Sequence, residues 1–304
     1  MNYSVIINEI ISLFLVIIVG VYCFRKNIIT EEVNDYLVKL LLDISLPCMI
    51  IRSFLFEFNS EIVKSIIKSF IYSPIVILVT LIISKVLLIK IEPKQRAVMH
   101  FANIFSNCGF IGFPVVNSVF GYEGVIYASI FNMFFNIFLW TYGVMIFSNN
   151  KNKDKYKYKK LLNPSIIAVL IGLILMIFNI KLPNVFDSTL SLIGGVTTPI
   201  SMLIVGVILA KVNFVNYLKD YRVYYSNFLK LVFLPIILIV IFKLFNESSI
   251  VAKTMIIITA MPAGVMNSIF AKKYGGDEEY SAMIVFSTTL MSALTVPIMI
   301  RLIL

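Results

Sequence analysis

The hydrophobic residues of this chain fall into ten long runs that are separated by short polar or basic segments. Each run has roughly 20 residues, the length that an α-helix needs to cross the hydrocarbon core of a bilayer. A membrane β-barrel would instead show alternating segments of about ten residues. The pattern predicts an all-α integral membrane protein with ten transmembrane helices, near residues 4–24, 35–56, 65–89, 97–119, 122–147, 162–180, 186–210, 224–245, 250–271 and 279–303.

Two of these runs are interrupted by polar residues, glycine and proline. The first interruption, Asn103 to Gly121, reads NIFSNCGFIGFPVVNSVFG, and the second, Met261 to Gly276, reads MPAGVMNSIFAKKYGG. Backbone groups freed at membrane depth need partners, so such breaks survive only inside protein or around a watery cavity. We therefore expect broken crossover helices in spans 4 and 9, with a substrate where they meet.

Short motifs recur in the two halves of the chain. The stretch SLP at 45–47 resembles TTP at 197–199, and VVNSVF at 115–120 resembles VMNSIF at 265–270, at nearly the same offset. With five spans in each half, the second half would be inserted upside down, as in the inverted repeats of secondary transporters. We predict a first five-helix repeat at 1–148, a basic linker at 149–160 and a second, inverted repeat at 161–304.

The composition agrees with a membrane protein. Of 304 residues, 60% are hydrophobic and 14% are charged, against about 45–50% and about 25% in soluble domains. The net charge of +10 does not indicate a nucleic-acid partner, because the basic residues cluster in the loops after odd-numbered spans. Cytoplasmic loops carry such an excess, so we expect a multi-pass protein of the plasma membrane with both termini extracytoplasmic. The lysines of the linker could also contact anionic lipid headgroups.

The interruptions supply candidate chemistry for binding an anion. Glycine and proline weaken helix continuity, and the helix that restarts after a break presents unpaired amides with partial positive charge. Asparagines with spacing i, i+4 lie on one helix face and can either bind a ligand or only join helices. The candidate substrate-binding residues are Asn103, Asn107, Gly109, Gly112, Pro114, Asn132, Asn136, Pro262, Gly264 and Asn267.

Two titratable residues are candidates for coupling to an ion. Asp43 lies inside the second span, where ionisable groups are costly and often functional, but Lys39 could neutralise it as a structural pair. His100, the single histidine, could titrate near neutral pH or have a structural role only.

Two motifs resemble the conserved cores of the auxin efflux carrier superfamily. They are NCGFIGFP at 107–114, followed by Gly121, and MPAGVMNSIFAKKYGGD at 261–277. Pro47 in span 2 is also similar, and the resemblance is to a prokaryotic member of this PIN-FORMED-like group. It implies a scaffold domain and a transport domain, each built from both repeats. Position by position, it places Asn107, Gly112 and Pro114 at the first crossover and Pro262, Gly264 and Asn267 at the second. The plant carriers have proline where this chain has Asn267.

The resemblance also implies the class of substrate, which is a small organic anion such as auxin or a dicarboxylate like malate or malonate. We expect a secondary transporter that works by alternating access, embedded in the lipid bilayer, and the resemblance suggests a homodimer. Two alternatives stay open: a receptor that binds an organic anion without moving it, and a sodium- or proton-coupled symporter of another substrate class. An enzyme is not expected, because one histidine excludes HExxH and no GxSxG serine occurs. We expect no cofactor and no metal.

Overall fold

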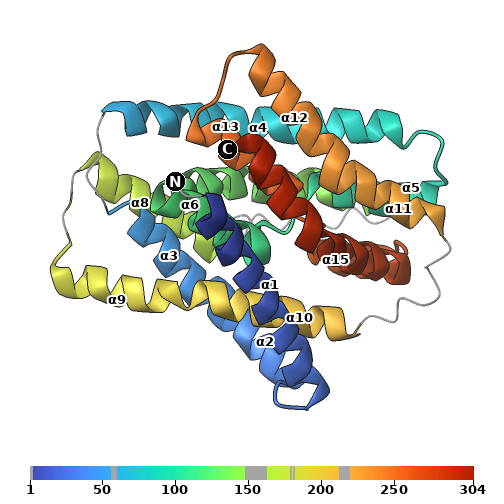
Figure 1. Cartoon of the computed structure of the whole chain (residues 1–304), viewed down its shortest axis with the longest axis horizontal. Helices are drawn as coiled ribbons and strands as arrows, with labels where there is room; N and C mark the ends of the chain where they lie inside the picture. Colours follow the sequence, from blue (N-terminus) through green and yellow to red (C-terminus); the bar gives the residue numbers. More distant parts are fainter. Residues whose placement is uncertain (1–2, 56–59, 148–162, 179, 181, 212–219) are drawn as a thin grey trace. The chain divides into compact units, whose positions relative to one another are not determined.

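The computed structural model describes residues 3–55, 60–147, 163–178, 180, 182–211 and 220–304 (Figure 1). The described part is helical apart from turns, short extended segments and one isolated β-bridge. In the first half, the elements are α1 Tyr3–Arg25, α2 Glu31–Leu40, η1 Leu41–Ser45, α3 Leu46–Ser53, α4 Ser60–Leu87, α5 Pro93–Ile104, η2 Cys108–Gly112, α6 Phe113–Phe138, η3 Leu139–Gly143 and α7 Val144–Phe147. In the second half, they are α8 Pro164–Ile177, α9 Asn184–Gly195, α10 Thr197–Lys211, α11 Tyr221–Phe228, η6 Leu229–Phe233, α12 Leu234–Leu244, α13 Ile250–Ala260, α14 Met266–Tyr274 and α15 Glu278–Ile303.

The all-α prediction is confirmed for the described residues, and each of the ten predicted ranges contains helix. Within the described ranges, five helical stretches are long and apolar enough to cross a membrane: Glu61–Leu87, Cys108–Phe147, Asn184–Lys211, Tyr221–Leu244 and Glu278–Ile303. Shorter apolar helices lie at Ile11–Arg25, Pro164–Ile177 and Ile250–Ala260. The chain is thus a multi-pass membrane protein, while the number of ten crossings and the orientation of the termini stay predictions.

The internal contacts divide the chain into two compact units. Unit 1 comprises Met1–Ile71, Gly109–Met133 and Lys159–Lys211, and unit 2 comprises Tyr72–Cys108, Phe134–Tyr158 and Val212–Leu304. Each unit therefore draws on both halves of the sequence. The predicted repeat boundaries at 148 and 161 and the basic linker at 149–160 lie outside the described residues.

Unit 1 is held together by close helix packing at glycines. Helices α1 and α10 lie side by side (Figure 1), and a methyl group on Gly206 would lie 2.2 Å from the carbonyl oxygen of Ile17. Gly20 faces Leu203 in the same way. Helix α3 packs against α8 and α9, where Gly172 faces Phe54. Small residues allow helix backbones to approach closely, which is how membrane helices gain packing energy.

Unit 2 contains an aromatic cluster around the end of α5. The ring of Phe101 lies 4.5 Å from that of Phe105, 5.3 Å from that of Phe147 and 5.2 Å from that of Phe270, between centroids. Gly143 makes room for this cluster, because a methyl group there would lie 3.1 Å from the Phe101 ring. The cluster fixes the position of the segment that follows α5.

Three π-helical turns precede prolines. The turns η1, η2 and η6 are centred on Asp43, Phe110 and Leu231, each four residues before a proline. Proline cannot donate to the carbonyl four residues back and clashes with it. A single π turn widens the helix at that point and relieves the clash. The prolines concerned are Pro47, Pro114 and Pro235.

Candidate functional site

Two unwound segments of unit 2 pair with each other. Helix α5 ends at Ile104 and α13 ends at Ala260, and the residues that follow form an antiparallel bridge between Ser106 and Ala263. The backbone N–H of Asn107 donates to the Pro262 carbonyl over 2.8 Å, and the backbone N–H of Gly264 donates to the Phe105 carbonyl over 2.9 Å. These reciprocal bonds satisfy backbone groups that the two broken helices leave without helical partners.

The residue types explain why the chain opens here. Pro262 has no amide to offer to α13, and Met261 before it takes an extended conformation, as residues before proline prefer. Gly264 allows the close approach, because an added methyl group would lie 3.2 Å from the carbonyl oxygens of Phe105 and Ser106. The Ala263 amide donates to the Thr288 hydroxyl over 3.2 Å. The second break therefore lies at the predicted residues.

The first break lies inside the predicted interruption Asn103–Gly121, but before Gly109, Gly112 and Pro114, the residues expected to weaken the helix. The unwound residues are Phe105 to Asn107, and Cys108–Gly112 form the π turn η2. The π turn relieves the proline clash without opening the helix, so the opening occurs where the partner segment can accept and donate hydrogen bonds. Gly121 adds a further interruption within α6, with φ of 62°, a conformation that glycine adopts readily.

A buried lysine contacts the paired segments. Lys230 of η6 is fully buried, and its Nζ donates to the Asn103 carbonyl oxygen over 3.1 Å and to the Ser106 hydroxyl over 2.6 Å. Sequence reasoning missed this residue. A signal was present, because Lys230 lies deeper inside its predicted span than any other lysine or arginine, and ionisable residues at such depth are functional candidates.

Two predicted asparagines of unit 2 join helices. The Asn103 side-chain amide donates to the Ser84 hydroxyl over 3.0 Å, and that of Asn267 donates to the Val98 carbonyl over 3.2 Å. Both residues are buried, and within the described residues both Oδ1 atoms lack a hydrogen-bond partner. Each side chain therefore fixes one helix to another and keeps one acceptor available.

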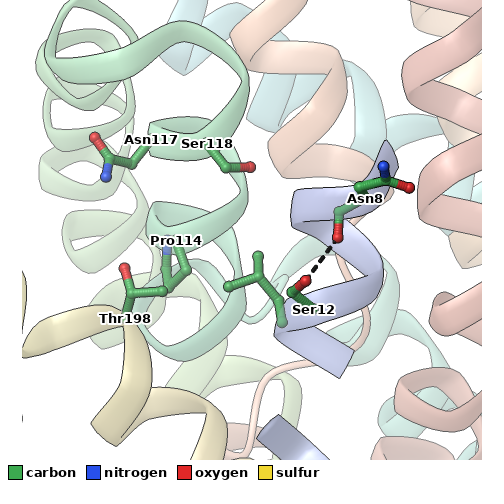
Figure 2. A pocket seen from close by; sticks show the side chains of 7 residues that line it. Asn8, Ser12, Pro114, Asn117, Ser118 and Thr198 are labelled. Carbon is green, nitrogen blue, oxygen red and sulfur yellow. Dashed lines mark hydrogen bonds between the residues drawn. The ribbon is translucent and has the colours of Figure 1, made fainter. Parts of the chain in front are cut away.

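A pocket of about 410 Å³ lies in unit 1 between α1, α6 and α10. Figure 2 shows the Ser118 hydroxyl pointing toward α1, where the Ser12 hydroxyl donates to the Asn8 carbonyl over 2.8 Å. The volume is within the range of small-molecule sites, about 300–1,000 Å³. Of the predicted site residues, only Pro114 lines it. The full lining consists of Asn8, Ser12, Leu13, Pro114, Asn117, Ser118 and Thr198.

The other predicted site residues are distributed over both units. Asn107 is buried in unit 2, Asn132 is buried in unit 1, and Asn136 is half-buried in unit 2. Gly109 has open space around its α-carbon, with nothing within 4 Å of an added methyl group. Their roles in binding stay predictions.

The two coupling candidates have different surroundings. Asp43 lies on an exposed face of η1, and no ion pair with Lys39 occurs among the described residues. His100 is buried in unit 2, with Nδ1 2.9 Å from the Ser84 hydroxyl and Nε2 2.9 Å from the Tyr142 hydroxyl. Both ring nitrogens therefore have neutral partners, which suits a structural histidine.

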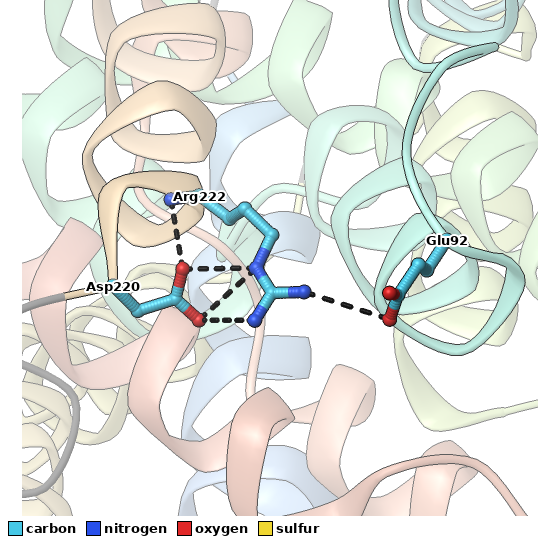
Figure 3. A network of polar contacts seen from close by, with 3 residues as sticks. All are labelled: Glu92, Asp220 and Arg222. Atoms are coloured by element: carbon cyan, nitrogen blue, oxygen red, sulfur yellow. Dashed lines mark hydrogen bonds and ion pairs between the residues drawn. The ribbon is translucent and has the colours of Figure 1, made fainter.

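A charged cluster joins the starts of two helices in unit 2 (Figure 3). Asp220 caps α11, and its carboxylate accepts from Arg222 Nε over 2.9 Å, while Arg222 Nη1 lies 3.6 Å from Glu92 Oε2. Partial burial alone would raise the pKa of Asp220, but the hydrogen bonds from the Arg222 side chain and amide outweigh burial and lower that pKa. Glu92 directly precedes α5, so the cluster ties the chain entering α5 to the chain entering α11.

Comparison with known proteins gives a match over nearly the whole chain. The profile of the family described as "Membrane transport protein" matches residues 5–300. An uncharacterized transporter of Methanocaldococcus jannaschii, MJ1031, is 22% identical over 306 residues, covering 95% of this chain and 96% of the relative. The uncharacterized transporter YfdV of Escherichia coli is 21% identical over 281 residues, covering 88% of each chain. These matches confirm the family resemblance carried by the two motifs.

Proposed function

Because the chain belongs to the membrane transport protein family, we propose that it is a secondary transporter of a small organic anion, working by alternating access. The paired unwound segments carry this proposal. Buried, non-helical backbone in a membrane protein is tolerated only inside protein or at a watery cavity. In secondary transporters it marks the substrate and ion sites.

Two features of unit 2 support an anionic substrate. Helix α14 starts directly after the second break, and within the described residues the amides of Val265 and Met266 have no backbone acceptor. Unpaired amides at a helix start favour negative charge. Lys230 adds a basic group that contacts Ser106 in the partner segment. A carboxylate is the ligand that such donors suit, and the dicarboxylates malate and malonate are the first to test.

A contact in unit 1 supports the proposed inverted repeats. Ser45 and Thr197 occupy corresponding positions in the SLP and TTP motifs, and their hydroxyl oxygens lie 2.7 Å apart. Residues related by a two-fold axis can touch only when they lie near that axis. This contact is what a chain of two inverted repeats would place near its pseudo-symmetry axis.

Uptake of labelled malate and malonate by proteoliposomes tests the proposal. We expect saturable uptake by the wild type and slower uptake by Asn107→Ala and Asn267→Ala, because both residues lie at the breaks. Asn117→Ala tests the unit 1 pocket in the same assay. The matched control is Asn184→Ala, since Asn184 is exposed and lines neither the breaks nor the pocket.

The outcomes separate the function from the site. If the wild type binds a dicarboxylate without accumulating it, the protein is a receptor and the transport proposal is wrong. If the wild type transports but all three site variants transport like Asn184→Ala, the function stands and the site assignment is wrong.

A further inference from the structure

The hydrogen bonds of Lys230 match a neutral amine. A protonated lysine has three N–H donors, whereas Nζ has two hydrogen-bond partners among the described residues, the Asn103 carbonyl and the Ser106 hydroxyl. A neutral amine has two N–H groups and one lone pair, so these two partners satisfy both of its donors. Protonation would leave one buried N–H without an acceptor.

The surroundings of Lys230 hold no counter-charge. Within the described part of the chain, no carboxylate lies at ion-pair distance from Nζ. The helices α5, α11, α12, α13 and α15 pack against η6, and the Cys108 thiol is the titratable group that interacts electrostatically with Nζ. His100 on α5 is bonded elsewhere. The charged residues of these five helices all lie in first or last turns: Lys94, Arg96, Arg222, Lys243, Lys253, Glu278, Glu279 and Arg301.

A buried cation without a counter-ion is costly in free energy. The cost disappears in two ways: the amine gives up its proton, or an anion arrives to balance the charge. The Asn103 and Ser106 partners belong to the first broken helix, and Ser106 is bridged to Ala263 of the second. Lys230 therefore contacts the segments to which the proposed function assigns the anion.

We infer that Lys230 is a proton-binding site linked to anion binding, so that the chain takes up one proton together with each organic anion. This inference rests on the proposed function. In the empty site the amine is neutral; when the carboxylate binds, a proton from solvent joins the Nζ lone pair and the ion pair is complete. Linkage is reciprocal, so protonation of Lys230 strengthens anion binding by the same factor by which the anion strengthens proton binding.

Calorimetry of malate and malonate binding to the purified full-length protein tests the inference. Titrations in two buffers of different ionisation enthalpy give the number of protons taken up per anion. Between about pH 7 and 9 the carboxylates stay ionised. We expect uptake of about one proton by the wild type, and an affinity that falls about tenfold per pH unit once the amine is neutral in the empty protein.

Two substitutions of Lys230 keep the test informative. Lys230→Arg carries a permanent charge, so it should bind the anion with no proton uptake and no pH dependence. Lys230→Gln should bind weakly at every pH, also without proton uptake. Lys243→Gln is the matched control, because Lys243 is exposed on α12. Cys108→Ser should keep the proton uptake, which separates the amine from the neighbouring thiol.

The results separate a failure of the proton-binding role of Lys230 from a failure of the proposed transport function. Anion binding by the wild type without proton uptake, or proton uptake that persists in Lys230→Arg, overturns the role of Lys230 and leaves the transport proposal intact. If neither malate nor malonate nor any other carboxylate binds the wild type, both fail together.

Discussion

Replacing Gly264 by alanine tests whether the close pairing of the two unwound segments is needed. The added methyl group would lie 3.2 Å from the carbonyl oxygens of Phe105 and Ser106, which is closer than such atoms ordinarily approach. Both oxygens belong to the backbone of a buried segment, so neither can swing away as a flexible side chain would. We expect the two segments to separate by a few tenths of an ångström.

The expected loss of stability follows from the hydrogen bond that this separation would weaken. The Gly264 amide donates to the Phe105 carbonyl over 2.9 Å. Such a bond contributes about 0.5–1.5 kcal/mol net, and a buried donor left unpaired costs about 1–3 kcal/mol. We expect the free energy of unfolding of Gly264→Ala to fall by about 1–3 kcal/mol. An equal loss in the free energy of anion binding would weaken affinity roughly five- to 150-fold.

Thermal unfolding in detergent and malate uptake by proteoliposomes measure the two effects. Gly195→Ala is the matched control, because it makes the same change at the end of α9, where nothing lies within 4 Å of the added methyl group. That control should unfold at the wild-type temperature or slightly above it, since alanine favours helix over glycine. Equal behaviour of the two variants, in stability and in uptake, would refute the argument from close packing.

The remaining predictions concern the two units separately. Gly206→Ala should lower the free energy of unfolding by about 1–3 kcal/mol through overpacking, because its methyl group would lie 2.2 Å from the Ile17 carbonyl; Gly195→Ala, with nothing within 4 Å, should not lower it. Asp220→Asn should destabilise the protein at neutral pH, since the lowered pKa of this carboxyl stabilises the folded state above its usual value of 3.8 and the effect is lost as pH falls through the folded pKa. Unfolding curves at pH 7 and well below pH 3.8 check this, and a constant difference between the two proteins would contradict it.

The fold class and the second break could be predicted because both depend on local chemistry. The length of an apolar run predicts a membrane helix without knowledge of its neighbours. Pro262 removes an amide wherever the helix lies, and Gly264 marks a close approach of backbone. The first break lies inside the predicted interruption Asn103–Gly121, but at Phe105–Asn107 and not at Gly109, Gly112 or Pro114, which have the stronger local signal.

The partners of the candidate site could not be predicted in the same way. Lys230 was visible as a lysine deep inside an apolar run, but its acceptors, the Asn103 carbonyl and the Ser106 hydroxyl, lie more than a hundred positions away in the sequence. Asn8 and Ser12 lie in the first run, far in sequence from the Pro114 side of the pocket. Tertiary packing alone brings such residues together.

The prolines show why Pro114 does not itself open the first broken helix. Pro74 and Pro297 lie inside continuous helices, and Pro47 and Pro235 follow π turns that keep the chain helical. Proline therefore bends or widens a helix here more often than it opens one. The described chain opens at Phe105–Asn107 and at Met261–Val265, where each segment supplies the hydrogen-bond partners that the other lacks. In a membrane protein an open backbone must be satisfied internally, so the position of a break depends on the partner segment as much as on the residues that interrupt the helix.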